Sequence, residues 1–188
     1  MQILMLGNSF TATNHLPDLL AQRTGAQVTA HTRGGARLAE QLNPATKLGS
    51  RTRAALDARC WDYVILQEMS HGPISAPEKY RDSVARLCGE IRAAGAVPVI
   101  YGTWAYRADC PRLAALGLTE ETMFHGMQDA CRGVATANNA LFADVGGAFF
   151  ACPDRANLYA ADGIHPNLRG AMLAADTLAQ VIRTHAAR

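Results

Sequence analysis

The sequence predicts an α/β fold: a three-layer α/β/α, flavodoxin-like doubly wound sheet of about five parallel strands. Short apolar runs have the length and composition of buried parallel strands. Amphipathic segments separate these runs, and strands that alternate with helices favour a parallel sheet with right-handed crossovers. The five runs are residues 2–6, 27–31, 63–66, 97–101 and 141–145.

Helix signals lie between the expected strands. Pro17 stands in the first turn of the first long helix, and Gly25 ends it. Ser75 and Glu78 have the spacing of a capping box, and Thr119 and Asn167 are the expected N-caps of the last two helices. The expected helices are residues 16–24, 36–42, 50–59, 75–94, 119–137 and 167–184.

Length and composition fit one domain spanning residues 1–188. The chain shows no internal repeat, low-complexity tract or charge block. A net charge of +2 is too mild to indicate a nucleic-acid or anionic-membrane partner. No apolar run approaches the 18 residues typical of a membrane span. We therefore expect a cytoplasmic protein, while a signal peptide removed before residue 1 is left open.

Cofactor and metal motifs are missing from the sequence. The five cysteines are odd in number and none shows C-x-x-C spacing, which argues against a zinc site or a disulfide framework. Neither a dinucleotide fingerprint nor a P-loop is present, and no histidines have metal-ligand spacing. The G-x-S-x-G elbow of the α/β-hydrolase fold is also absent. We expect no cofactor and no metal.

The first strand leads directly into Gly7, Asn8 and Ser9. Ligands of open α/β sheets bind beyond the carboxyl ends of the strands, so Ser9 is placed where a nucleophile would be presented. On these residues alone, a helix N-cap explains Asn8 and Ser9 equally well.

Polar residues or glycines follow all five strands, and a doubly wound sheet brings these strand ends to one edge. A helix cap at Ser9 does not account for this convergence. The residues are Ser9, Gly34 and Gly35, Gln67, Thr103 and Trp104, and Asp162 and His165.

Asp162 and His165 complete a possible serine-hydrolase site. A serine hydroxyl needs an adjacent base, which is usually histidine, and a carboxylate fixes the tautomer of that histidine. An isolated D-x-x-H is also compatible with a surface loop, but a serine at the same sheet edge strengthens the catalytic interpretation. Three groups are candidate oxyanion donors: the Ser9 and Gly35 backbone N–H groups and the Gln67 amide.

Each of these donors has a structural alternative. A plain turn explains Gly34 and Gly35, and a buried amide bonded to backbone explains Gln67. Candidate substrate contacts are Gly34, Arg33, His71 and Trp104. Arg33 with Arg37 suits a substrate carboxylate, but two loop arginines are commonly just solvated.

Four blocks, in order, resemble the SGNH hydrolase superfamily of GDSL-type esterases and lipases, within a G-N-S-F-T subgroup. They are residues 7–11, Gly34 with Gly35, residues 64–68 and residues 162–166. The resemblance implies Ser9 as nucleophile, His165 as general base, Asp162 as its orienting partner, and the Ser9 and Gly35 N–H groups as oxyanion donors. Asn8 replaces the usual aspartate of the first block, and Gln67 replaces the asparagine of the third.

The expected activity is that of a serine esterase. It would act without a metal through an acyl-enzyme, and the resemblance suggests small acyl groups such as acetyl on a carbohydrate or similar polar substrate. Two alternatives remain open: a catalytically silent glycan-binding module of the same fold, and an acyltransferase. The sequence does not indicate an oligomeric state.

Overall fold

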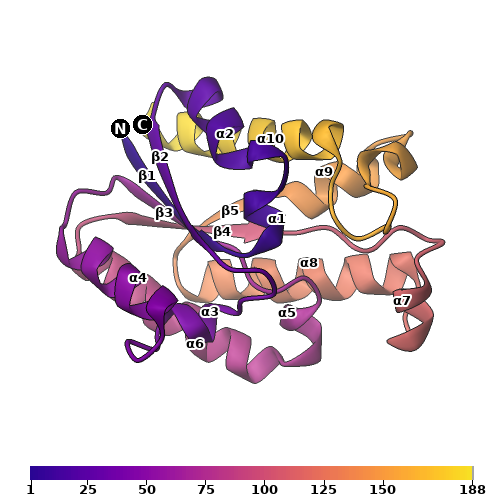
Figure 1. Ribbon diagram of the computed structural model, residues 1–188, viewed down its shortest axis with the longest axis horizontal. Coiled ribbons are helices and arrows are strands. Elements are labelled where there is room, and N and C mark those ends of the chain that lie inside the picture. The colour runs from indigo at the N-terminus through magenta and orange to yellow at the C-terminus, as the bar shows by residue number, and fades with distance from the viewer. Residues whose placement is uncertain (188) are drawn as a thin grey trace.

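The computed structural model of the protein, which describes residues 1–187, contains one sheet of five parallel strands in the order β2-β1-β3-β4-β5 (Figure 1). This order is that of a doubly wound, flavodoxin-like sheet and confirms the predicted three-layer fold. The strands are β1 (Gln2–Gly7), β2 (Gln27–Thr32), β3 (Tyr63–Leu66), β4 (Val97–Gly102) and β5 (Leu141–Asp144).

Helices cover both faces of the sheet (Figure 1). One layer contains α1 (Ser9–Ala12), α2 (Leu16–Thr24), α9 (Val145–Ala151) and α10 (Leu168–Ala186), with the 3₁₀ turns η1 (Thr13–His15) and η2 (Arg155–Leu158) beside them. The other layer contains α3 (Leu38–Gln41), α4 (Lys47–Asp57), α5 (Gly72–Ser75), α6 (Pro77–Ala93) and α8 (Glu120–Ala137). The short helix α7 (Pro111–Ala115) lies beyond the carboxyl end of the sheet.

The side chains of β1 point alternately into two apolar cores, one on each face of the sheet. Ile3 and Met5 pack in the core beneath α2 and α10, while Leu4 and Leu6 pack in the core beneath α4 and α6. All four are at most 1% exposed, as expected for a central strand covered on both faces. The edge strand β2 is more exposed along its length.

A stack of three aromatic rings anchors the core on the α10 side. Trp104 is fully buried, and its ring lies 4.7 Å from that of Phe10 and 4.3 Å from that of Phe149, centroid to centroid. Its indole N–H donates to the Ile164 carbonyl at 3.0 Å. The segment after β4 is thereby tied to both the start of α1 and the loop before α10.

The helix starts differ from the sequence prediction at two places. The expected capping box at Ser75 does not form, because residues 72–75 make their own helical turn and α6 begins at Pro77 after Ala76. The expected helix at 50–59 starts earlier, at Lys47, because the Thr46 side chain accepts from Gly49 N–H and caps it. The short helices α1, α5, α7 and α9 have no counterpart among the predicted helices.

Within residues 1–187, no helix has both the length and the apolar character needed to cross a membrane.

We expect Trp104→Ala to lower the free energy of unfolding by about 3–5 kcal/mol, because it removes a fully buried ring and its hydrogen bond. Urea unfolding followed by circular dichroism measures this loss. Phe124→Ala is the matched control, since Phe124 also stacks on a ring, that of Phe150, but is only half-buried. Equal losses in the two variants would contradict a special role for the Trp104 stack.

Candidate active site

Ser9 lies at the point where the strand order reverses, between β2 and β3. A side chain at Gly7 would meet Gln67 Oε1 at 2.6 Å, so only glycine fits where the chain leaves β1. Asn8 caps α1 by accepting from Phe10 N–H at 3.1 Å, and Ser9 is the first residue of that helix. The cap and the nucleophile position therefore coexist.

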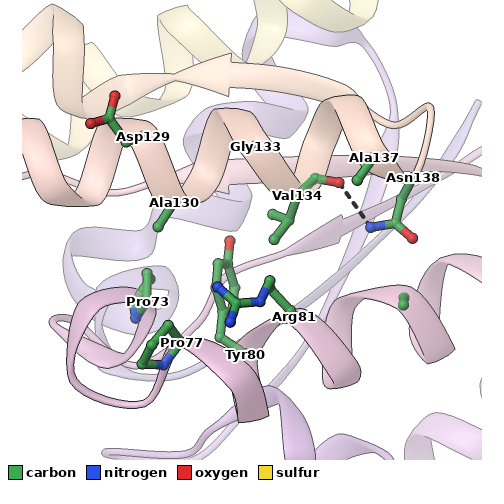
Figure 2. Close-up of a pocket in the computed structure, with 11 residues that line it drawn as sticks. Pro73, Pro77, Tyr80, Arg81, Asp129, Ala130, Gly133, Val134, Ala137 and Asn138 are labelled. Atoms are coloured by element: carbon green, nitrogen blue, oxygen red, sulfur yellow. Dashed lines mark hydrogen bonds between the residues drawn. The ribbon is translucent and has the colours of Figure 1, made fainter.

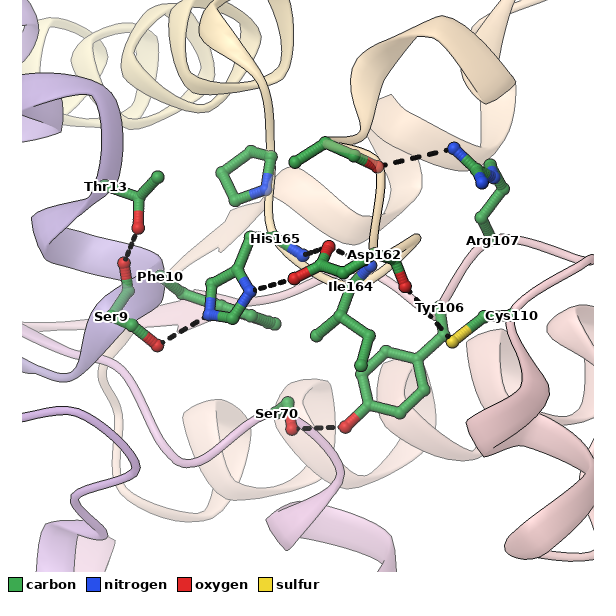
Figure 3. Close-up of polar contacts among 12 residues, drawn as sticks. Ser9, Phe10, Thr13, Ser70, Tyr106, Arg107, Cys110, Asp162, Ile164 and His165 are labelled. Carbon is green, nitrogen blue, oxygen red and sulfur yellow. Dashed lines mark hydrogen bonds and ion pairs between the residues drawn. The ribbon is translucent and has the colours of Figure 1, made fainter.

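Ser9, His165 and Asp162 form a continuous chain of polar contacts (Figure 3). His165 Nε2 lies 2.9 Å from Ser9 Oγ, and His165 Nδ1 lies 2.6 Å from Asp162 Oδ2. The other oxygen of Asp162 accepts from the Ile164 and His165 backbone N–H groups at 2.9 and 3.0 Å. The structure brings together the three residues that the sequence analysis selected, in the order that a Ser-His-Asp triad requires.

The pKa of Asp162 reflects this environment. Burial raises the pKa of the carboxyl, but the hydrogen bonds from His165 and Ile164 and the charge of His165 outweigh burial, so the pKa lies below its ordinary value. Asp162 is therefore a carboxylate at neutral pH, as needed to orient the imidazole and to stabilise its charged form.

The segment after β4 holds the loop that carries Asp162 and His165. Arg107 N–H donates to the Gly163 carbonyl at 2.8 Å, and the Trp104 indole holds the next carbonyl. Gly163 has φ +68°, a left-handed conformation that glycine adopts without strain. These contacts hold the loop in place independently of Ser9.

Two backbone N–H groups are available to bind an oxyanion. Ser9 N–H stands at the start of α1, and Gly35, with φ +69°, lines the same cavity. Neither N–H donates to an acceptor within the part of the chain that the structure describes. The Ala36 carbonyl accepts from the Asn8 side chain at 3.0 Å. This bond ties the loop that contains Gly34 and Gly35, here called the glycine loop, to the turn at Asn8 and Ser9.

Glu68 also holds the glycine loop in place. Its buried carboxylate accepts from Leu38 N–H at 3.0 Å and from Met69 N–H at 2.9 Å. Burial raises the pKa of Glu68, and these two N–H groups, with the charge of Arg37, oppose the rise only in part. The carboxylate thus joins the glycine loop to the segment that follows β3.

Gln67 differs from its expected role as an oxyanion donor. Its side chain is 1% exposed, and its Oε1 accepts from Asn8 N–H at 3.0 Å and from the Thr11 hydroxyl at 2.9 Å. Its amide nitrogen donates to the Glu68 carbonyl. Both the oxygen and the nitrogen of the Gln67 side chain therefore have hydrogen-bond partners inside the protein. Gln67 braces the turn at Asn8 and does not line the cavity.

The expected substrate contacts also change. Trp104 is fully buried in the aromatic stack and so cannot touch a substrate. Arg33 is exposed and pairs with Glu40, with Nε 2.7 Å from Oε1, and neither Arg33 nor Gly34 lines the cavity. His71 lies behind the cavity wall, its Nδ1 3.0 Å from the Tyr106 hydroxyl.

The cavity at Ser9 has a volume of about 220 Å³. Its wall includes residues that the sequence analysis missed: Asn8, Phe10, Met69, Ser70, Tyr106, Arg112 and Ile164. Tyr106 and Ser70 face one another with their oxygens 2.6 Å apart (Figure 3). Tyr106 lies only four residues beyond β4, so extending the strand-end argument past Trp104 would have found it. Arg112 lies on α7, a helix that no sequence pattern predicted.

A second cavity, of about 300 Å³, lies between α6 and α8 (Figure 2). Pro73, Pro77 and Val134 line it, with the Tyr80 hydroxyl donating to Cys131 Sγ at 3.5 Å beneath. It contains no nucleophile beside a base, in contrast to the cavity at Ser9. Among residues 1–187, no group of three or more His, Cys, Asp or Glu side chains is placed to hold a metal ion.

We expect Gln67→Leu to destabilise the protein, because it leaves Asn8 N–H and the Thr11 hydroxyl without their acceptor. Each unsatisfied buried donor costs about 1–3 kcal/mol. Chemical denaturation measures the loss. Lower turnover with an unchanged free energy of unfolding would instead support direct oxyanion binding by Gln67.

The buried carboxyl of Glu68 predicts a pH-dependent contribution to stability. Since its folded-state pKa is raised above the ordinary 4.5, the folded protein takes up this proton at a higher pH than the unfolded chain. The free energy of unfolding of the wild type should therefore rise relative to that of Glu68→Gln as the pH falls through the raised folded-state pKa towards the ordinary value of 4.5. Urea titrations of both proteins at several pH values measure this difference, and a difference that shrinks would contradict the raised pKa.

Comparisons with known proteins agree with this geometry. The GDSL-like Lipase/Acylhydrolase family matches residues 5–173. A candidate SGNH hydrolase from Slackia heliotrinireducens is 52% identical, with a TM-score of 0.94 over 97% of this chain and 98% of that one. No curated protein matches the chain.

More distant structures share the fold. A DUF4886 family protein from Bacteroides uniformis is 21% identical, with a TM-score of 0.78 over 98% of this chain and 83% of its own. A catalytic mutant of an acetylxylan esterase from Geobacillus stearothermophilus is 15% identical, with a TM-score of 0.69 over 96% of this chain and 93% of that one. The family match and the 52% identical structure show that this chain belongs to the GDSL-like lipase/acylhydrolase family of SGNH hydrolases, whose members are generally ester-hydrolysing enzymes.

Proposed function

We propose that the protein is a serine esterase that hydrolyses small acyl esters, with acetyl the leading candidate, through a Ser9-His165-Asp162 triad. The observation that carries the proposal is the pair of contacts at His165, 2.9 Å to Ser9 Oγ and 2.6 Å to Asp162 Oδ2. A serine hydroxyl in this setting has a base for its proton and a carboxylate that fixes the tautomer of that base.

In the acylation step, Ser9 Oγ attacks the ester carbonyl while His165 Nε2 accepts the hydroxyl proton. Negative charge develops on the carbonyl oxygen, and the Ser9 and Gly35 N–H groups are assigned to bind it. The intermediate collapses, His165 gives its proton to the leaving alcohol, and an acyl-enzyme remains. A water molecule, deprotonated by His165, then attacks the acyl carbon. The second intermediate collapses, His165 returns the proton to Ser9 Oγ as the acyl–oxygen bond breaks, and the acid is released.

The size and polarity of the cavity support a small acyl group on a polar alcohol. About 220 Å³ suits a short substituent better than a long alkyl chain. The hydroxyls of Ser70 and Tyr106 in its wall offer hydrogen bonds to a polar alcohol such as a sugar. The distant fold neighbour from Geobacillus stearothermophilus, described as an acetylxylan esterase, shows that this scaffold supports acetyl-ester chemistry in that protein.

We expect Ser9→Ala to lower kcat for 4-nitrophenyl acetate at least 10³-fold, because the nucleophile is lost while binding groups remain. The wild type should hydrolyse the acetate faster than the octanoate. Ser50→Ala, on the exposed side of α4, is the matched control and should retain full activity. Full activity in Ser9→Ala would refute the proposal.

Labelling by a fluorophosphonate separates an esterase from a silent binding module. The adduct should map to the tryptic peptide 1–23, which contains Ser9, and not to peptide 60–79, which contains Ser70. An unlabelled protein would favour the binding module. Adding a sugar alcohol as a competing acceptor tests the acyltransferase alternative, since a transferase would yield the acylated sugar in place of free acid.

A further inference from the structure

Arg112 is an arginine without a partner at the wall of the active-site cavity. It stands on α7, is exposed, and lines the cavity that contains Ser9 and His165. Within residues 1–187 the Arg112 side chain makes no hydrogen bond and no ion pair, and only its backbone carbonyl accepts, from Leu116 N–H within the helix. By contrast, Arg107 Nε lies 2.5 Å from Asp109 Oδ1. Its guanidinium is therefore available to a ligand.

No carboxylate neutralises this cavity. None of the residues that line it is acidic. The carboxylates that contact residues of the cavity wall already have partners: Asp162 accepts from His165 and from the Ile164 N–H, and Glu68 accepts from the Leu38 and Met69 N–H groups. Asp109, three residues before Arg112, pairs with Arg107.

The positive charge of Arg112 acts on His71, which lies behind the cavity wall. Burial lowers the pKa of His71, and the charges of Arg112 and Arg37 lower it further. His71 is therefore neutral at neutral pH, and it bonds to the Tyr106 hydroxyl. A neutral group can accept a hydrogen bond but cannot cancel a cation, so His71 does not offset the charge of Arg112.

We propose that Arg112 binds an anionic group, a carboxylate or a phosphate, on the alcohol side of the ester substrate and so selects anionic esters over neutral ones. A guanidinium presents two parallel N–H donors that match either anion. Because the cavity holds only about 220 Å³ and the acyl group is small, the anion would lie within a few bonds of the scissile oxygen. This inference rests on the proposed esterase function and names its substrate class.

The test uses three acetyl esters of one ring: 3-acetoxybenzoate, 3-acetoxyphenyl phosphate and the neutral isostere 3-acetoxybenzamide. Acetate release gives kcat and KM for each. We expect Arg112→Gln to lower kcat/KM for at least one anionic ester about 10–100-fold, mainly through KM, since a hydrogen bond to a charged group is lost. The neutral amide should change less than about threefold, and Arg112→Lys should restore part of the loss. The better of the two anions identifies carboxylate or phosphate as the preferred group.

Arg81→Gln is the matched control, because Arg81 lies on α6 away from this cavity, and it should leave all three rates unchanged. The inference is overturned if Arg112→Gln affects the amide and the anionic esters equally, or affects none of them.

A binding measurement separates this inference from the proposed function. Ser9→Ala binds ester without turning it over, so its Kd for each ester reports anion preference without chemistry. Tighter binding of an anionic ester that is lost in Ser9→Ala/Arg112→Gln supports the anion site even if the wild type hydrolyses nothing, in which case only the esterase proposal fails. Equal binding of all three esters overturns the anion site while leaving the esterase proposal to its own tests.

Discussion

The bond from Asn8 N–H to the Gln67 side-chain oxygen determines how the chain leaves the central strand. Gln67 directly follows β3, and its side-chain oxygen accepts from both Asn8 N–H and the Thr11 hydroxyl in the first turn after β1. Glu68, the next residue, holds the glycine loop through Leu38. Ser9 and Gly35, the proposed nucleophile and second oxyanion donor, are therefore positioned by two consecutive residues. Since β1 and β3 are register-paired neighbours, the sheet itself sets the spacing of these parts.

Asp162 and His165, the proposed acid–base half of the site, are held by a separate set of contacts. Residues after β4 hold the loop that carries Asp162 and His165, through the Trp104 indole and the Arg107 backbone. Phe10 connects the two halves, because its ring stacks on Trp104 and meets the His165 ring edge-on at 5.4 Å. The contact between Ser9 and His165 thus joins two preorganised units, which is how hydrogen-bonding groups come to be aligned before a substrate arrives.

The sequence predicted the parts of this protein that depend on long or repeated patterns. Five apolar runs and the long helices specified the layers, and the strand-end argument selected Ser9, Asp162 and His165. The helices that escaped prediction are four to seven residues long, too short for a helical period to be recognised.

The sequence also does not predict the direction in which a side chain points. Nothing in the sequence says which way an amide or an indole turns, so Gln67 and Trp104 were assigned to the cavity although both point into the core. Arg112 was missed for the converse reason, since its place depends on the path of the whole segment between β4 and α8.

Ser9 and His165 are 156 positions apart in the chain, yet their side chains touch. Contacts between such distant positions have the highest loop-closure cost and are expected late in folding. The Ser9 half also needs β1 paired with β3, and the Asp162–His165 half needs the segment after β4 in place. Recovery of hydrolysis during refolding would consequently report the completion of tertiary structure, and not the earlier appearance of helices.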